Sequence, residues 1–357
     1  MDGLASRAHD ERIRRRPGFF EHLHPPTIPA REARFGYTFG LGGVSLFLFL
    51  TLIVSGALEL FYYEPSLEGA NASVQRITHL VPYGWLVRGI HYWAGQTLAV
   101  TAALHLVRVL LTGAYKPPRR LNWLLGVSLL AAVLLLDFTG LVLRWDNDIA
   151  WALTVGTNLL RTIPVVGEGL YLAAVGGGEI AGATVVRFFG WHIFGLVLPA
   201  SIVLVWHLFR VRRDGGISHR LVPSAADSPD APRLPRADLV RREAIAALFT
   251  SVALLCLTVV SPPAIGARAD FSHLPSEAAA PWFFLWVQQL LRLGDPLLMG
   301  VVIPAGLLAL VALVPFVLDR NPAGVGSWFN RQGRAAQLTV LACIGFVLAL
   351  IVKGALS

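Results

Sequence analysis

The chain has 357 residues, of which 55% are hydrophobic and 15% are charged, and its formal net charge is +8. A composition this apolar excludes an ordinary soluble domain and favours a protein that crosses a membrane several times. Most of the Lys and Arg residues outside the apolar stretches lie on one side of the predicted membrane, so the basic excess reflects topology and no nucleic-acid partner is expected.

Seven apolar stretches are long enough to cross a bilayer, because a spanning helix needs about 20 residues. The sixth stretch is longer than one crossing requires, so its start is predicted to be a short surface segment. The expected fold class is therefore an all-α polytopic membrane protein with seven transmembrane helices, a four-helix bundle followed by a three-helix C-terminal block. We expect the spans at 36–58, 84–111, 121–143, 186–210, 243–262, 286–318 and 335–353.

The basic residues also predict the orientation. They are concentrated on the side of the N-terminal tail, which places the N-terminus inside and the C-terminus outside. No apolar h-region precedes residue 36, so no signal peptide is expected, and we expect a multi-pass protein of the bacterial cytoplasmic membrane. Cys256 and Cys343 lie in separate spans, and the sequence has no CxxCH motif for attaching a c-type haem.

A polar segment rich in Pro, Ser, Asp and Arg divides the spans and is predicted to be a cytoplasmic linker. The outside segment 144–185 is predicted to carry an amphipathic helix on the membrane surface. Residues 263–285 form a second long outside loop. We expect four units, namely a cytoplasmic tail, a four-span domain, the linker and a three-span domain, at 1–35, 36–212, 213–242 and 243–357.

Four histidines lie inside spans and form two pairs. His91 and His105 have the spacing i, i+14 in the second span, and His192 and His207 have the spacing i, i+15 in the fourth. Each pair returns to one helix face, with about 21–22 Å between its members. Both helices are predicted to run inwards, so His91 faces His192 at the outer level and His105 faces His207 at the inner level. Two such facing imidazoles suit a six-coordinate haem iron that transfers electrons. The alternative, core histidines bonded to neighbouring helices, accounts less well for four histidines at matching depths.

Glycines repeat the same spacing in two other spans. Gly42 and Gly56 lie in the first span, Gly126 and Gly140 lie in the third, and each pair has the spacing i, i+14. Glycine lets a backbone approach a bulky ring closely, so these positions are predicted to accommodate a flat macrocycle. Ordinary packing of small residues between membrane helices is the alternative.

With these features the chain resembles cytochrome b of the quinol–cytochrome c oxidoreductase family, and its b6 branch in particular. The family signature is two His pairs on the second and fourth helices together with four glycines, and a spacing of 15 on the fourth helix is the b6-type value. The resemblance covers residues 35–220 closely, and the last three spans are similar to subunit IV, fused here to a b6-like block. Similar runs are "FYYEPSLEGANASVQ", "YGWLVRGIH", "LHLVRVLLTGAYKPPR", "IPVVG" and "GISH".

The resemblance implies a membrane quinol oxidoreductase subunit of a Rieske/cytochrome b complex, which passes electrons between an outer and an inner quinone site. It implies two non-covalent b haems with His91 and His192 as outer iron ligands and His105 and His207 as inner ones. Expected partners are a Rieske iron–sulfur protein and a c-type cytochrome subunit, and a homodimer is a further expectation. Gly40 stands where b6 proteins carry the cysteine that tethers an extra haem, so no covalent third haem is expected.

The outer quinol site departs from the family pattern. The family motif is Pro-Glu-Trp-Tyr, whose glutamate accepts a quinol proton, but in the run "EAAAPWFFL" Pro281 stands in the glutamate's place. Trp282, Phe283 and Phe284 are expected to wall a quinone ring, and an aromatic belt at the interface is the alternative.

The nearest carboxylate in sequence, Glu277, is the expected proton acceptor, and Asp270 and His273 on the same loop are alternatives. The missing glutamate keeps open a second function, a quinone-linked di-haem electron conduit for another redox partner without bifurcation. A transporter with structural histidines is a third class, and it would lack haem.

Several arginines lie near the expected haem edges, where a guanidinium can form bidentate bonds with propionate groups. Arg88 lies three residues before His91, and Arg119 and Arg212 lie on the inner side. The positive-inside rule accounts for the inner arginines but not for Arg88. Asp137 is an acid within the third span, so it is a candidate for a proton path, with a structural pairing as the alternative.

Overall fold

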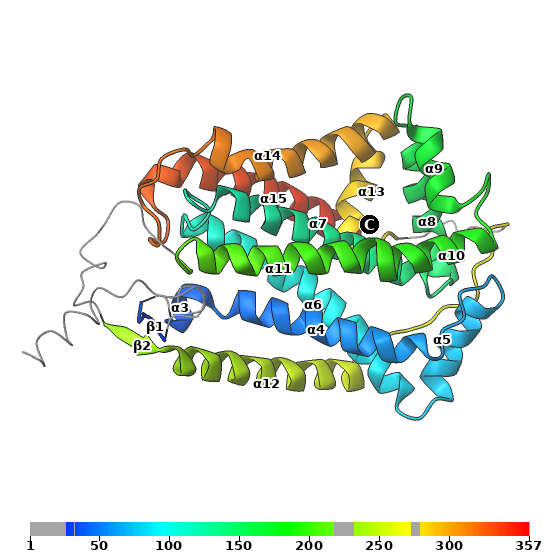
Figure 1. Ribbon diagram of the computed structural model, residues 1–357. Coiled ribbons are helices and arrows are strands. Elements are labelled where there is room, and N and C mark those ends of the chain that lie inside the picture. Colours follow the sequence, from blue (N-terminus) through cyan, green and yellow to red (C-terminus); the bar gives the residue numbers. More distant parts are fainter. Residues whose placement is uncertain (1–25, 32, 218–231, 273–278, 357) are drawn as a thin grey trace, which may run out of the picture.

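Seven helices long and apolar enough to cross a membrane run roughly parallel in the computed structural model, which describes residues 26–31, 33–217, 232–272 and 279–356 (Figure 1). The prediction of an all-α protein with seven spans is therefore confirmed. The helices are α4 (Leu41–Leu60), α6 (Gly84–Leu111), α7 (Arg120–Val142), α10–η1–α11 (Gly182–Gly190, Trp191–Leu196, Val197–Arg213), α12 (Arg236–Val260), η4–α14 (Leu298–Val302, Ile303–Val317) and α15 (Arg334–Leu356).

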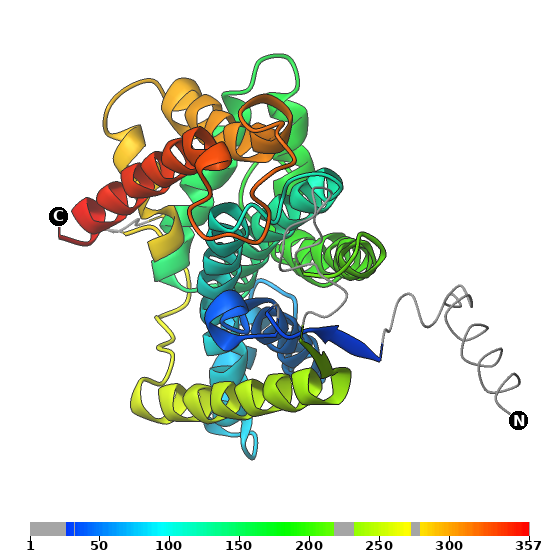
Figure 2. The same cartoon turned by 90° about the vertical axis from the view of Figure 1, so that its left-hand side faces the viewer.

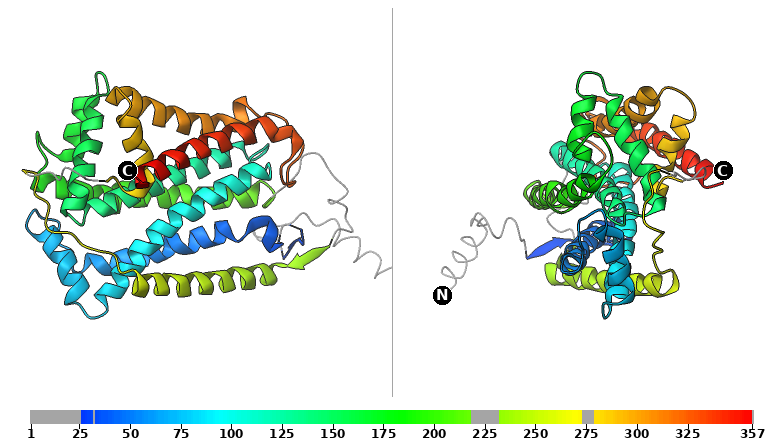
Figure 3. Two further views of the ribbon diagram at one scale, coloured as in Figure 1. Left: turned by 180° about the vertical axis from the view of Figure 1, so that it is seen from behind. Right: turned by 90° about the vertical axis from the view of Figure 1, so that its right-hand side faces the viewer.

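Shorter elements lie at the two ends of the bundle. Figures 1 and 3 show α5, α8 and α9 at one end, and the strands β1 and β2 with α3 at the other. The two strands pair antiparallel. Helix α8 begins where the Asp146 side chain accepts a hydrogen bond from the backbone N–H of Ile149, an N-cap that satisfies an otherwise unpaired donor. The bounds are β1 (Thr27–Pro29), α3 (Phe35–Thr38), α5 (Gly69–His79), α8 (Asn147–Arg161), α9 (Gly167–Val175) and β2 (Arg233–Pro235).

Two span boundaries differ from the hydropathy pattern. The predicted sixth span, 286–318, begins with the short helix α13 (Leu285–Leu291) and a turn, as expected for the start of this long stretch, and only η4–α14 is the spanning helix; the short helix η3 (Trp282–Phe284) precedes it. Helix α12 begins at Arg236, earlier than the apolar stretch that starts at residue 243. Its first turns consist largely of Ala, Leu, Arg and Glu, which favour a helix regardless of polarity, so hydropathy marks only its apolar part.

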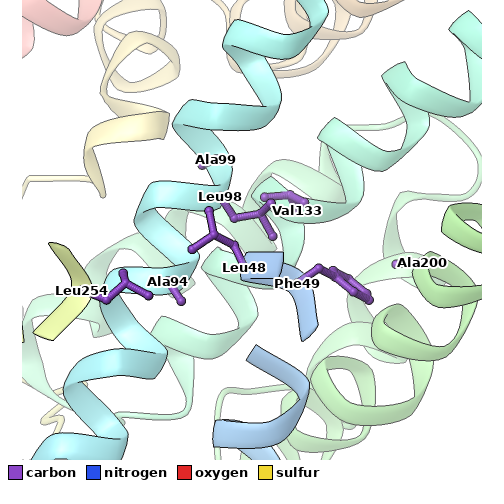
Figure 4. Close-up of a cluster of buried hydrophobic side chains, with 8 residues drawn as sticks. All are labelled: Leu48, Phe49, Ala94, Leu98, Ala99, Val133, Ala200 and Leu254. Carbon is purple, nitrogen blue, oxygen red and sulfur yellow. The ribbon is translucent and has the colours of Figure 1, made fainter. Parts of the chain in front are cut away.

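The four-helix bundle consists of α4, α6, α7 and α11, with α4 packed against α6 and α11 against α7. Buried apolar side chains from these helices meet in its middle (Figure 4), among them Phe49, Leu98 and Val133. Leu254 of α12 joins this cluster from outside the bundle.

The last three spanning helices lie on two sides of this bundle. Helix α12 packs against α4 and α6, whereas α14 packs against α7, and α15 against α13. Figure 2 shows α12 on the opposite side of the molecule from α14 and α15. The C-terminal helices therefore flank the bundle rather than form a separate layer.

A buried ion pair joins the bundle to the C-terminal helices at the end where α6 finishes. The Nζ of Lys116 lies 3.0 Å from Oδ2 of Asp319, and both side chains are excluded from solvent. The Tyr115 hydroxyl donates a hydrogen bond to the same carboxylate, and Lys116 also donates to the Ala323 carbonyl at 2.8 Å. Burial and the bond to Asp319 raise the pKa of the Tyr115 phenol above its ordinary value, so this group stays a neutral donor.

We expect Lys116→Met to destabilise the protein by about 3–5 kcal/mol, because it leaves the Asp319 carboxylate buried without its cation. The measurement is the apparent melting temperature of the protein in detergent. The double variant Lys116→Met/Asp319→Leu should recover most of the loss, since no buried charge is then left unpaired. The matched control is Glu168→Gln, which breaks the exposed Arg161–Glu168 pair and should change stability little. Equal melting temperatures for Lys116→Met and Glu168→Gln would contradict this role.

Candidate functional site

The four membrane histidines line two cavities in the four-helix bundle. The first, which we call the His91 cavity, has a volume of about 350 Å³ and is lined by His91 and His192. The second, the His105 cavity, has about 710 Å³ and is lined by His105 and His207. Both volumes fall in the range of ligand sites, about 300–1,000 Å³.

The two cavities share a wall of three apolar side chains. Phe49, Leu98 and Val133 line both cavities and belong to the buried cluster in the middle of the bundle. In Figure 4 these three side chains lie close together between the helices that supply them. Groups held in the two cavities would therefore be separated by a thin apolar partition.

His91 and His192 face one another across their cavity. Their ring centroids are 6.5 Å apart, and the ring planes are inclined by 68°. A metal–imidazole bond is about 2.0–2.1 Å long, so two rings that bind one metal from opposite sides have centroids roughly 6–7 Å apart. The described residues contain no group of three or more His, Cys, Asp or Glu side chains that could hold a metal ion by themselves. This donor set fits a metal whose other ligands come with it, as in haem.

Backbone geometry explains why the spacing is one longer between His192 and His207 than between His91 and His105. The segment η1, Trp191–Leu196, is π-helical and interrupts the α-helix directly at His192. A π-helical turn takes up an extra residue. The later residues of α11 are therefore returned to the phase that the shorter spacing would give, and His207 lines the same cavity as His105.

Two hydroxyl groups, which the sequence did not reveal, orient the rings of the His91 cavity. The Ser55 Oγ lies 2.9 Å from Nδ1 of His91, and the Thr139 Oγ1 lies 3.0 Å from Nδ1 of His192. Each hydroxyl donates its own proton to a carbonyl one turn earlier in its helix, Thr51 at 2.7 Å and Leu135 at 2.9 Å.

Because each hydroxyl proton is already donated to a backbone carbonyl, the hydroxyl oxygen must accept the hydrogen bond in its contact with the histidine. The ring proton therefore lies on Nδ1, and Nε2 is unprotonated and available to bind a metal. The signal in the sequence is a hydroxyl residue directly before Gly56 and before Gly140. In the other cavity, leucine precedes both Gly42 and Gly126. The Nδ1 of His105 is buried and has no hydrogen-bond partner among the described residues.

Each of the four glycines lies against one histidine ring. A methyl group at Gly56 would lie 3.0 Å from Cε1 of His91, and one at Gly140 would lie 3.0 Å from Cε1 of His192. In the other cavity, the corresponding distances are 3.2 Å from Gly42 to His105 and 3.5 Å from Gly126 to His207. The glycines thus allow α4 and α7 to approach the rings on α6 and α11 closely.

Arginines lie at both cavities. Arg88 is buried, lines the His91 cavity and donates to the carbonyls of Pro263 and Ala264 at 2.9–3.3 Å. Arg119 lines the His105 cavity and donates to the Gly216 carbonyl at 2.9 Å. Arg212 lies on the last turn of α11 and does not line that cavity.

A further buried arginine, Arg108, was not among the expected site residues. It lines the His105 cavity, donates to the Tyr37 carbonyl at 2.9 Å and lies over the Tyr37 ring. Arg108 follows His105 by three residues, as Arg88 precedes His91 by three. This matching spacing was the feature of the sequence that could have indicated Arg108 as a site residue.

The aromatic segment Pro281–Phe284 lies outside both cavities, against α6 and α7. Phe284 packs edge-on against Phe138 with centroids 5.7 Å apart, and Phe283 is buried. The Trp282 indole N–H donates to the side-chain oxygen of Gln96 at 2.6 Å.

Of the proton acceptors expected near this segment, Glu277 and His273 lie outside the described residues. The Asp270 carboxylate accepts hydrogen bonds from Ser272, and its backbone N–H donates to Asn147.

Known proteins resemble this chain in sequence and in fold. The family model described as "Cytochrome b/b6/petB" matches residues 30–215. Cytochrome b6 of Synechocystis sp. is 37% identical over 175 residues, 49% of this chain and 79% of that protein. Cytochrome b6 of Heliomicrobium gestii is 38% identical over 177 residues, 50% of this chain and 83% of that protein.

A solved structure described as "Hyperthermophilic respiratory Complex III" has a TM-score of 0.79, covers 99% of this chain and 91% of its own, and is 24% identical. The structural likeness therefore extends the match in fold to the whole chain. Helical membrane proteins with paired histidines facing across a bundle form the class that this fold and these cavities define. Within that class, the chain belongs to the cytochrome b/b6 family, whose cofactor is haem b.

If each cavity holds a b haem, Gly56→Leu and Gly140→Leu should each reduce haem binding in the His91 cavity and Gly42→Leu should reduce it in the His105 cavity, because the new side chain would displace a histidine ring. Gly126→Ala should be tolerated, since a methyl group there makes only an ordinary contact. The measurement is haem content and the reduced-minus-oxidised spectrum. The control Gly306→Leu adds the same side chain at a position where an added Cβ would meet no other segment of the described residues within 4 Å. Full haem content in all the leucine variants would show that the glycines serve helix packing alone.

Proposed function

We propose that this chain is the di-haem b subunit of a quinol-oxidising Rieske/cytochrome b complex. The observation that carries the proposal is the pair of imidazoles held 6.5 Å apart between α6 and the π-helical start of α11, with a second histidine-lined cavity behind a shared apolar wall. His91 and His192 would hold one b haem, and His105 and His207 the other. When bound, each haem supplies a centre that gains and loses one electron.

The protein's own residues would fix the ligands and the haem edges. Ser55 and Thr139 hold the rings of His91 and His192 with Nε2 available. Arg88 at the His91 cavity and Arg119 at the His105 cavity would bind propionate carboxylates. In this proposal Arg212 contributes positive charge at the inner surface and does not line the cavity.

The distribution of basic residues supports an orientation with the His91 cavity near the outer surface of the bacterial cytoplasmic membrane and the His105 cavity near the inner surface. Electrons would then cross the membrane from the outer to the inner haem through the wall of Phe49, Leu98 and Val133. These three side chains carry no group that could pass a proton, so the haems would exchange electrons without a proton path through the wall.

Two quinone regions would lie at the ends of this route. The outer one would be walled by Trp282, Phe283 and Phe284, with Glu277 as the proton acceptor that its place in the sequence favours; the carboxylate of Asp137 is weighed against it below. The inner one would lie at the larger cavity, where Asn122, Arg242 and Glu243 add polar groups to the lining. Their presence supports a region in which a quinone could be both held and protonated.

The proposed partners are a Rieske iron–sulfur protein and a c-type cytochrome, with a second copy of the chain completing a homodimer. The whole-chain match in fold to a respiratory Complex III structure supports this assembly. Pro281 in place of the family glutamate favours one alternative, a quinone-linked di-haem electron conduit for another redox partner without bifurcation.

The test of this function is haem stoichiometry and quinol-driven reduction. We expect about two non-covalent haems per chain, since two pairs of ligands are available. His207→Ala should remove the haem of the His105 cavity while the other haem keeps its spectrum. In membranes, oxidising the high-potential acceptor in the presence of quinol should cause transient reduction of haem b. Net oxidation of haem b in that experiment would favour the conduit, and a haem content of one or zero would reject both.

The hydroxyl groups predict a difference between the two haems. An Nδ1–H that donates a hydrogen bond makes its imidazole a stronger electron donor, which stabilises oxidised iron. Ser55→Ala and Thr139→Val should therefore each raise the midpoint potential of the outer haem and leave the inner haem unchanged. Redox titration followed at the haem absorption bands measures both potentials. Ser45→Ala is the control for the outer haem. It also removes a hydroxyl group from α4, but this hydroxyl contacts the Thr101 hydroxyl at 3.2 Å and not a histidine ring of the His91 cavity. Equal shifts at both haems would contradict the assignment.

A further inference from the structure

Helix α7 borders both the His91 cavity and the aromatic segment Pro281–Phe284, and two adjacent residues of this helix contact the two. The Phe138 ring packs against Phe284 on one side. Asp137 lines the His91 cavity on the other. Successive side chains on a helix diverge by about 100°, so neighbouring positions can serve two compartments.

Asp137 is a carboxylate in an apolar environment. Its Oδ2 atom is buried and has no hydrogen-bond partner among the described residues. Its Oδ1 atom lies against Gly95, where a methyl group would approach it to 2.6 Å, so the glycine provides the room that the carboxylate occupies. An unpaired acid inside a membrane span is costly, and such residues usually serve a function.

Gln96 lies both in the lining of this cavity and at the aromatic segment. It follows Gly95 on α6, lines the same cavity as Asp137, and accepts the hydrogen bond of the Trp282 indole. The sequence neighbour of Asp137, Phe138, and the sequence neighbour of Gly95, Gln96, therefore each contact the aromatic segment, one from α7 and the other from α6. Within the aromatic segment itself, Pro281, Trp282, Phe283 and Phe284 carry no carboxylate or other basic side chain that could take the proton.

We propose that Asp137 accepts a proton from quinol at the outer site, an inference that rests on the proposed quinol oxidation. In this step one quinol O–H bond breaks and an O–H bond forms on the Asp137 carboxylate. Oxidation of one quinol to quinone releases two protons and two electrons. Asp137 takes one proton, the other leaves to water, and the electrons leave to the iron–sulfur partner and to haem b.

The other titratable side chains of the cavity are less suited to this task. Tyr63 donates its hydroxyl to the Leu143 carbonyl at 3.0 Å, and burial raises the pKa of this phenol, so it remains protonated. Glu59 lies close to the Arg88 guanidinium. Its sequence neighbours make none of the contacts with Trp282 or Phe284 that Gln96 and Phe138 make. Besides the two histidines, the titratable groups that line this cavity are Glu59, Tyr63, Arg88, Tyr92, Asp137 and Arg144.

The experiment compares Asp137→Asn with Glu277→Gln and with the control Asp148→Asn in membranes that contain the full complex. Asp148 is a carboxylate in the first turn of α8 that does not line the cavity, so its variant makes the same chemical change elsewhere. The probes are a short-chain benzoquinol and a short-chain naphthoquinol, with haem b reduction followed by stopped-flow absorbance. Dithionite, which reduces haem without deprotonating a quinol, is the second reductant.

We expect Asp137→Asn to slow quinol-driven haem reduction by at least about tenfold, in line with the loss of a general base. The ionisation of one group should also disappear from the pH profile of this rate. Haem content and the dithionite-reduced spectrum should stay unchanged, and Asp148→Asn should behave as the wild type. A wild-type rate and pH profile in Asp137→Asn would overturn the proposal, as would a loss confined to Glu277→Gln.

Failure of the underlying function gives a different result. If the wild-type complex shows no quinol-driven haem reduction with either probe while dithionite reduces both haems, the proposed quinol oxidation itself is wrong. If the wild type reacts and Asp137→Asn reacts equally well, only the role of Asp137 is rejected.

Discussion

The distance between the second and fourth spanning helices, α6 and α10–η1–α11, is the constraint on which the rest of the bundle depends. These two helices carry all four membrane histidines, and the His91 and His192 rings lie 6.5 Å apart, a separation at which one metal ion could reach both. Protein interiors are densely packed, so a displacement of either ring would also displace the side chains around it and change the separation of the two rings. The other helices are therefore fitted around this separation.

Helices α4 and α7 meet the constraint by presenting glycine where each ring needs space. The π-helical turn at His192 meets it along the helix axis, since it absorbs the additional residue between His192 and His207. Both devices sacrifice regular packing or regular hydrogen bonding for the position of an imidazole. Departures of this kind are common at functional sites.

The two cavities have the same plan but different chemistry. In the His91 cavity, the hydroxyl groups of Ser55 and Thr139 fix the ring orientations. In the His105 cavity, the ring of His105 has no such partner on Nδ1 among the described residues, and the lining is wider. A protein with this asymmetry can give two identical cofactors different redox properties.

The C-terminal helices complete the molecule from two sides. Helix α12 is attached to α4 and α6, whereas α14 is held to the bundle by the buried Lys116–Asp319 pair and by the Trp123 indole bond to the Val311 carbonyl. A chain that fuses these helices to the bundle can position the aromatic segment beside α7. Such placement matters because Phe284 and Trp282 contact the helices that line the His91 cavity.

The sequence by itself determined the number of spanning helices, the two histidine pairs and the glycines that accompany them. These features are periodic, and a helix converts a regular spacing along the chain directly into a shared face. Hydropathy likewise predicted most of the spans to within a few residues, except where polar residues with high helical propensity extend α12 to Arg236 and where a turn divides the sixth stretch.

The tertiary structure alone decided which side chains support those histidines. The bonds from His91 to Ser55 and from His192 to Thr139 join residues on different helices, and so does the contact of Asp137 with Gly95. The same is true of Arg108 with Tyr37, and the Lys116–Asp319 pair joins segments that follow different helices. Such contacts depend on how far apart two helices lie and how they are rotated, and a spacing along one helix carries no information about either quantity.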